Sequence, residues 1–145
     1  MSFGFYLDSN LTVPATLTSP INVIINTVGG GGYVDIPIWF GSPDETKKAQ
    51  AASDPGVDNI TITVTDINTS IHNADETTGP YWVLALNSSD LDTNPRNNTI
   101  EIGTEVLGGT ENAVQFYLRI FEPEQPPNVY EDWILTTNAL IITDV

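Results

Sequence analysis

The chain has 145 residues, of which 40% are hydrophobic and 9% aromatic, enough apolar material for one core of ordinary size. It carries 19 acidic and four basic residues, and a net charge of −15 argues against nucleic acid or a membrane surface as a partner. The absence of cysteine excludes disulfides, thiolate nucleophiles and cysteine-based zinc sites. One histidine and four basic side chains leave little for acid–base catalysis, so we expect no enzymatic activity.

The N-terminal residues Met1–Asp8 have neither a basic region nor an apolar run, so the sequence shows no secretory signal. The longest apolar runs, such as Val23–Ile25 and Ala139–Ile142, are far shorter than the ~20 residues of a membrane span. We therefore expect synthesis in the cytoplasm and a soluble chain. Five sequons follow from a composition rich in Asn and Thr rather than from glycosylation; their asparagines are Asn10, Asn59, Asn68, Asn87 and Asn97.

Four glycines, Gly29–Gly32, separate the first segment from the rest of the chain. One interpretation is a hairpin between strands Ile21–Val28 and Tyr33–Phe40. The other is a hinge, which makes Met1–Val28 an N-terminal arm that docks on a neighbour. The aromatic residues near the N-terminus also fit a first strand packed on the chain's own core. We expect a single domain over residues 1–145, with residues 33–145 as its core.

Three segments alternate between apolar and polar residues with the period of a half-buried strand. They are Val34–Phe40, Ile60–Asp66 and Val114–Ile120. Pro37 lies on the outward face of the first segment and cannot donate a ladder hydrogen bond. We therefore expect that strand to be an edge strand or to contain a bulge.

Further strands are predicted where shorter apolar runs lie between turn residues. They are Ile21–Val28, Tyr81–Leu86, Thr99–Ile102 and Trp133–Thr143, the last broken into two near Asn138. Pro43–Ser53 is the one segment predicted as a short helix or 3₁₀ segment, since Ser42 suits a cap and Asp44–Glu45 suit a helix N-terminus. Many short strands with regular turns are typical of an all-β sandwich or barrel.

Asp90–Glu101 is the segment with metal-ligand spacing. Its side-chain oxygens stand at positions 1, 3, 5, 9 and 12 of a calcium-loop pattern, on Asp90, Asp92, Asn94, Asn98 and Glu101. Pro95, however, stands at position 6, where the sharp turn needs glycine, and the flanks are typical of strands rather than helices. We expect a polar turn with no cofactor, and a calcium site in this loop is the alternative.

The other chemistry-bearing residues indicate no active site. His72 lies in a polar stretch with no nucleophile motif and is interpreted as a solvated loop residue. Adjacent carboxylates arise freely in so acidic a chain, as in Asp44/Glu45, Asp75/Glu76 and Glu131/Asp132. Lys47–Lys48 is flanked by acids and makes no nucleic-acid patch. The glycine run precedes a strand rather than a helix, so it lacks the context of a phosphate loop.

Two stretches carry a resemblance to a known family. The first is Trp39–Pro43 followed by Lys47–Val64, and the second is Ile100–Ile120. They resemble small tailed-bacteriophage proteins of immunoglobulin-like type, with similar W/F-G-S-P, A-S-x-P-G-x-D-x-I and G-G-x-x-N-A-V blocks. The resemblance spans about Tyr33 to Phe121 and implies an immunoglobulin-like Greek-key β-sandwich of about 7–9 strands. It also implies a structural protein of the virion, with no catalytic residues to carry over.

A capsid decoration (cement) protein is the favoured hypothesis, because strong acidity is harmless on the outside of a shell that faces water. Its expected partner is the major capsid protein or another virion protein, and a homo-oligomer is expected around a local symmetry axis. The N-terminal arm or the proline-rich loop Glu122–Tyr130 would supply anchoring contacts. The alternatives are a tail, neck or baseplate component, and a host-surface carbohydrate-binding module. In the latter, sugar rings would stack on Trp39, Trp82 and Trp133, although each fits a core position as well.

Overall fold

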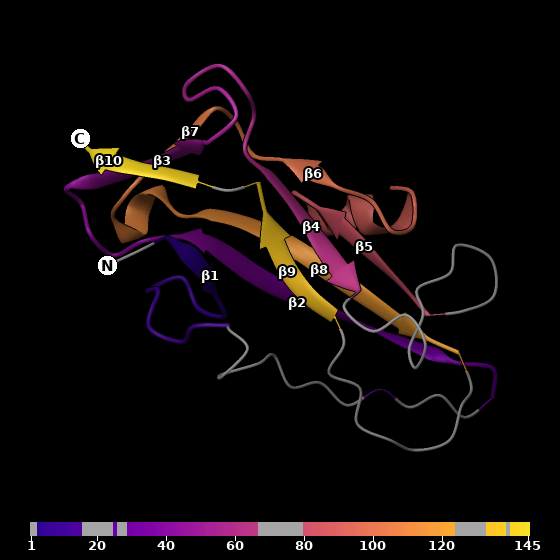
Figure 1. The fold of residues 1–145 in the computed structure, drawn as a ribbon. Helices are drawn as coiled ribbons and strands as arrows, with labels where there is room; N and C mark the ends of the chain where they lie inside the picture. The colour runs from indigo at the N-terminus through magenta and orange to yellow at the C-terminus, as the bar shows by residue number, and fades with distance from the viewer. Residues whose placement is uncertain (1–2, 16–24, 26–28, 67–79, 124–132, 139) are drawn as a thin grey trace.

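The chain folds as a β-sandwich of two layers, which confirms the predicted all-β class (Figure 1). The computed structural model describes residues 3–15, 25, 29–66, 80–123, 133–138 and 140–145. The first layer, called sheet A, has four antiparallel strands in the order β1-β2-β8-β5. Their bounds are Gly4–Tyr6 for β1, Gly32–Gly41 for β2, Val114–Glu122 for β8 and Tyr81–Ala85 for β5.

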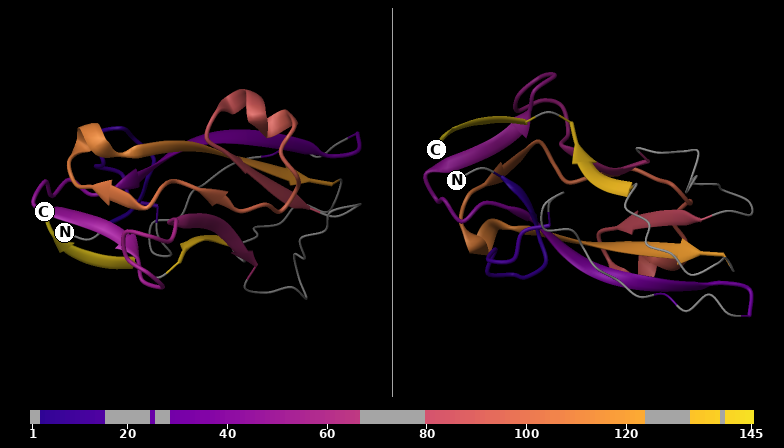
Figure 2. Two further views of the ribbon diagram at one scale, coloured as in Figure 1. Left: turned by 90° about the horizontal axis from the view of Figure 1, so that it is seen from above. Right: turned by 60° about the horizontal axis from the view of Figure 1, so that its bottom comes forward.

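The second layer consists of two three-stranded sheets laid end to end (Figure 2). One has the order β10-β3-β7, with bounds Leu140–Asp144, Lys47–Ala51 and Glu105–Leu107. The other has the order β9-β4-β6, with bounds Trp133–Thr137, Thr61–Asp66 and Ile100–Glu101. β3 and β4 follow one another along the chain, as do β6 and β7, and β9 and β10. Each of these three pairs contributes one strand to each sheet, in the same order, and the pairing is interrupted between the two sheets.

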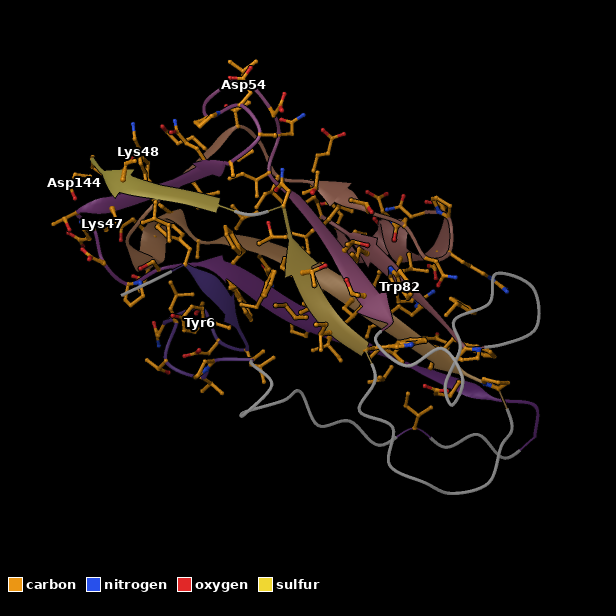
Figure 3. The ribbon with its side chains drawn as sticks, in the orientation of Figure 1. Tyr6, Lys47, Lys48, Asp54, Trp82 and Asp144 are labelled. Atoms are coloured by element: carbon orange, nitrogen blue, oxygen red, sulfur yellow. The ribbon has the colours of Figure 1, made fainter. Side chains whose placement is uncertain are left out.

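Asn138 bridges this break, where the sequence predicted an interruption of the last strand. The Thr61 amide donates to its side-chain oxygen over 2.9 Å, and its side-chain nitrogen donates to the Asn59 carbonyl over 3.0 Å. The predicted division of Trp133–Thr143 into two strands is confirmed. On the neighbouring segment, residues 52–59 form a loop that projects from the sandwich with Asp54 near its tip (Figure 3).

The connections between the strands differ from those of an immunoglobulin domain. Immunoglobulin sandwiches place strands A-B-E-D in one sheet and C-F-G in the other, with hairpins inside a sheet. Sheet A shares the A-B-E-D pattern, with β8 between β2 and β5, but from β2 onward the chain alternates between the layers, so consecutive strands of the described chain do not pair with one another. The sandwich is confirmed, whereas the immunoglobulin-like Greek-key order is not.

The core lies between the layers and is built from the alternating rows that the sequence predicted. Its largest fully buried apolar side chains come from strands or strand ends in both layers: Phe40, Phe116, Ile38, Ile60, Ile62 and Leu84. All seven predicted strands that lie in the described parts of the chain occur, with bounds shifted by one or two residues. This count takes Trp133–Thr143 as two strands. The predicted strand Ile21–Val28 lies outside the described residues, apart from Ile25.

Pro37 lies where β2 has no neighbour on one side among the described residues. The Phe5 carbonyl accepts from Ala15, so Phe5 faces away from β2, while Gly4 and Tyr6 face it. Because the backbone groups of a strand alternate in direction, the backbone nitrogen of Pro37 points to the same side of β2 as that of Trp39. Pro37 itself lies beyond the end of β1. The register with β8 is continuous, so β2 has no bulge, and it is not an edge strand of sheet A, although at Pro37 it pairs with no described residue on the β1 side.

The predicted helix at Pro43–Ser53 is wrong, because Lys47–Ala51 is strand β3. Ala49 and Ala51 are fully buried, while the lysines are paired with acids on the neighbouring strands. Pairing with β7 and β10 therefore overrides the modest helix propensity of the Lys-Lys-Ala-Gln-Ala run. In the described parts of the chain, the helical segments are two 3₁₀ turns, η1 (Ser88–Asp92) and η2 (Thr110–Asn112). No helix of the described residues has the length and apolarity to cross a membrane.

The described N-terminal residues, 3–15, pack on the body of the sandwich. β1 pairs with the end of β2, and Phe3, Phe5 and Leu7 contact the main core. Of the predicted arm, residues 1–2, 16–24 and 26–28 lie outside the described part of the chain. The turn that follows β1 is closed by Asp8, whose carboxylate accepts hydrogen bonds from Thr12 and from the Val13 amide.

This turn has a pH dependence of known sign. The Thr12 hydroxyl, and then the Val13 amide, hold the pKa of the Asp8 carboxyl below its usual value. The stabilisation is therefore complete above the unfolded-state pKa of ~3.9 and is lost as pH falls through the lower native value. We expect the Thr12 and Val13 amide shifts to titrate below ~pH 4 in the wild-type NMR spectrum and not in Asp8→Ala. An Asp8 pKa at or above the unfolded-state value would contradict this prediction.

Candidate functional site

The residues of the possible calcium loop have separate structural partners. Asp92 forms an ion pair with Arg119 over 2.9 Å, and Glu101 accepts a hydrogen bond from Asn59. Asn94 and Asn98 both donate to the Leu84 carbonyl. Asp90, in η1, accepts from Asn87, the residue that precedes η1. Within the described residues, no group of three or more His, Asp or Glu side chains is placed to hold a metal ion.

The asparagines of this loop instead close the free edge of β5. Trp82 and Leu84 direct their backbone groups away from β8. Asn97 binds both groups of Trp82, through its own amide over 2.7 Å and its side-chain oxygen over 3.2 Å. Asn98 binds both groups of Leu84, over 2.7 Å to the N–H and 2.8 Å to the carbonyl. The side-chain amides thus replace a further strand.

The remaining acidic and basic candidates have local roles where they are described. Asp44 accepts hydrogen bonds from the Thr46 hydroxyl and amide, which close a turn and lower the pKa of its carboxyl. Lys47 and Lys48 form ion pairs with Asp144 and Glu105 (Figure 3). Four candidates lie outside the described residues: His72, Asp75/Glu76, Glu131/Asp132 and most of the loop Glu122–Tyr130.

Two of the three tryptophans are part of the core. Trp82 is buried, its indole N–H donates to the Asn98 carbonyl over 3.0 Å, and its ring meets Trp133 edge to face at 5.5 Å. Trp82 therefore lacks an open ring face for a sugar, whereas Trp133 is half-buried against the core. Trp39 is half-buried and alternates with the core residues Ile38 and Phe40, so it lies on the outer face of sheet A.

The outer face of sheet A carries a row of aromatic side chains. Tyr33, Phe121 and Tyr81 are direct cross-strand neighbours on β2, β8 and β5, and we call them the aromatic row. The Tyr81 and Phe121 rings stack at 4.8 Å with an angle of 20° between them. The Arg96 guanidinium lies 4.1 Å from the centre of the Tyr81 ring. Tyr33 is 60% exposed, so the row ends in an open ring.

Arg119 lies next to the aromatic row on the outer face of sheet A, and its contacts hold its side chain in place. Its guanidinium binds both oxygens of Asp35, over 2.7 and 3.1 Å, and Asp92 over 2.9 Å. It also lies 4.4 Å from the centre of the Tyr33 ring. The hydrogen bond with Asp35 is the main reason that its pKa is raised above its already high value. The cation is therefore permanent and held in one orientation against Tyr33.

Comparison of the chain with protein-family models, curated proteins and solved structures found no significant match.

The charge on this face differs from the charge of the chain as a whole. Arg96 and Arg119 are the two arginines of the sequence, and both lie there. Arg119 is paired with Asp35 and Asp92, and Arg96 adds a second positive charge, so these four described charges balance in a chain of net charge −15. Beside it, Leu91 of η1 covers Val83 and Ala85 and forms a second small core. Within the aromatic row, Tyr33 is exposed, whereas Phe121 and Tyr81 are half-buried.

Sequence reasoning missed this site, although part of the signal was present. Tyr33 and Asp35 occupy the outward positions of a strand whose inward row was recognised, as do Arg119 and Phe121 on β8. Aromatic and arginine side chains at outward positions are the composition of interface hot spots. Their proximity follows from the register between strands that lie far apart in the sequence.

Proposed function

We propose that this chain is a structural protein of a tailed-bacteriophage particle, and specifically a capsid decoration protein that attaches to its partner through the outer face of sheet A. The aromatic row with its two arginines is the observation that carries the attachment. Tyr33 and Arg119 supply the side chains that dominate protein–protein hot spots, and they are already held in place before binding.

Charge supports the same surface. Many copies of a chain at −15 repel one another, so contacts form most favourably where charge is locally balanced. The outer face of sheet A meets this condition because Arg96 and Arg119 balance Asp35 and Asp92. The virion assignment itself rests on the resemblance of Tyr33–Phe121 to small phage structural proteins. An all-β sandwich is compatible with that role.

The copy number in purified particles tests the virion assignment. Quantitative mass spectrometry should find this chain in numbers comparable with the major capsid protein. A small number would favour the tail, neck or baseplate alternative over decoration. Absence from particles would overturn the virion assignment and return attention to the carbohydrate-binding alternative.

Two matched truncations test the attachment surface. We expect Tyr33→Ala to weaken binding to particles that lack the protein by about tenfold or more, because it removes an anchoring ring. Val57→Ala is the control, since Val57 is 68% exposed on the loop between β3 and β4, in the other layer. Binding is measured by sedimentation with particles, after thermal melting has shown both variants to be folded. Equal binding of the two variants would contradict the proposed surface.

A further inference from the structure

The edges of the sheets differ in how they are closed. In sheet A, the outward groups of β5 are bound by Asn94, Asn97 and Asn98. At the other side of that sheet, residues 13–15 bind the outward groups of β1 through the pairs Leu7–Val13 and Ala15–Phe5. Exposed strand edges are templates for pairing with another chain, and closed edges prevent it.

β10 leaves its outer edge open among the described residues. The Val145 amide donates to the Thr46 carbonyl over 2.8 Å, so Val145 faces β3. In an antiparallel pair the backbone groups alternate, so Ile141 and Thr143 also face β3. Leu140, Ile142 and Asp144 therefore direct their N–H and C=O groups away from the sheet. In the right-hand view of Figure 2, β10 lies at the margin of the molecule beside β3.

The composition of β10 lacks the usual protection of an edge strand. It has no proline, glycine or lysine, and its sequence is Leu-Ile-Ile-Thr-Asp. Ile142 is 39% exposed and Val145 is 70% exposed. The single charge, on Asp144, is paired with Lys47 (Figure 3). The edge is thus apolar and locally balanced in a chain that is otherwise strongly acidic.

We propose that the β10 edge pairs antiparallel with the β10 edge of a second copy of this chain, which joins the two second layers across a twofold axis. A pair centred on Ile142 matches Ile142 with itself and Leu140 with Asp144 of the other copy. All outward groups of the strand are then bound, because each such pair exchanges both backbone hydrogen bonds. A twofold interface requires a self-complementary surface, and an antiparallel strand edge has this property. The inference does not depend on the virion assignment.

Proline substitution tests the edge without breaking the internal ladder. Ile142→Pro removes an N–H that faces outward, so the pairing of β10 with β3 keeps its hydrogen bonds. Leu107→Pro is the matched control. Gly108 donates to the Lys47 carbonyl, so Leu107 directs its N–H to the opposite edge of the same sheet. In sedimentation equilibrium, we expect Ile142→Pro to raise the dimer dissociation constant at least tenfold and Leu107→Pro to leave it unchanged.

Three results would overturn the proposal: a wild-type chain that stays monomeric at millimolar concentration, a dimer unaffected by Ile142→Pro, or a dimer lost equally in the control. Hydrogen exchange of the wild-type chain gives an independent measurement, should a proline variant fail to fold. The amides of Ile142 and Asp144 should become protected as concentration rises, whereas those of Ile141 and Thr143 should be protected throughout. Raising NaCl from ~20 to ~500 mM should strengthen association by screening the repulsion between acidic chains.

Discussion

Replacing Gly108 by alanine is expected to lower the free energy of unfolding by about 3 kcal/mol or more. A Cβ at this position would overlap the backbone oxygen of Asp44 and would lie 2.8 Å from that of Lys47. Neither atom belongs to a side chain that can turn away. The backbone must therefore separate where Gly108 and Gly109 donate to Lys47 and Ser42. Urea unfolding followed by tryptophan fluorescence measures the loss.

Gly4→Ala is the control for this substitution. Gly4 is also in the sandwich and pairs with Gly41, but a Cβ there meets nothing within 4 Å. The two variants differ in steric overlap and share the chemical change, so Gly4→Ala should shift stability by less than about 1 kcal/mol. Equal unfolding midpoints for the two variants would mean that the turn at Asp44 can move without cost, contrary to the prediction.

Replacing Asn98 by alanine is expected to cost about 2–3 kcal/mol. Its side chain satisfies both backbone groups of Leu84, a fully buried residue. The Leu84 carbonyl keeps the hydrogen bond from Asn94, over 2.9 Å, but its N–H loses the partner shown by the structure. A buried unpaired donor carries the full desolvation penalty, which sets the size of the effect. The loss is measured by urea unfolding, and faster exchange of the Leu84 amide should accompany it.

Asn87→Ala provides the matched comparison at an exposed position. The Asn87 side chain makes one long hydrogen bond, 3.3 Å to Asp90. Its removal should change stability by less than about 0.5 kcal/mol. A similar small change for Asn98→Ala would show that water or the backbone replaces the amide at the β5 edge, and the edge-closing role of Asn98 would then be wrong.

The sequence was informative wherever one face of a strand is buried. The alternation in Ile60–Asp66 and Val114–Ile120 predicted both the strands and their inward rows, because a period of two has no other common cause. The prediction was wrong at Lys47–Ala51, where small and basic residues favour a helix locally. There the outcome depends on pairing with Glu105–Leu107 and Leu140–Asp144, which are distant in the sequence.

The candidate site depends on the same long-range information. Tyr33, Phe121 and Tyr81 form a row because three strands share one register, which no local pattern reveals. The cluster of asparagines near Asn98 was recognised as a polar turn. Its role in closing an edge depends on the position of β5, about a dozen residues earlier, and on the direction of its outward groups.

The alternation of the chain between the layers has a consequence for how the protein is made. β2 pairs with β8, and β3 pairs with β10, so the ladders join segments separated by most of the sequence. Domains dominated by such non-local pairs fold slowly, on a timescale of about milliseconds to seconds. β3 cannot complete its sheet until residues 140–144 have left the ribosome. For most of translation, the apolar residues of the first strands therefore have no partner strands to cover them. The acidic charge of the nascent chain helps to keep it in solution.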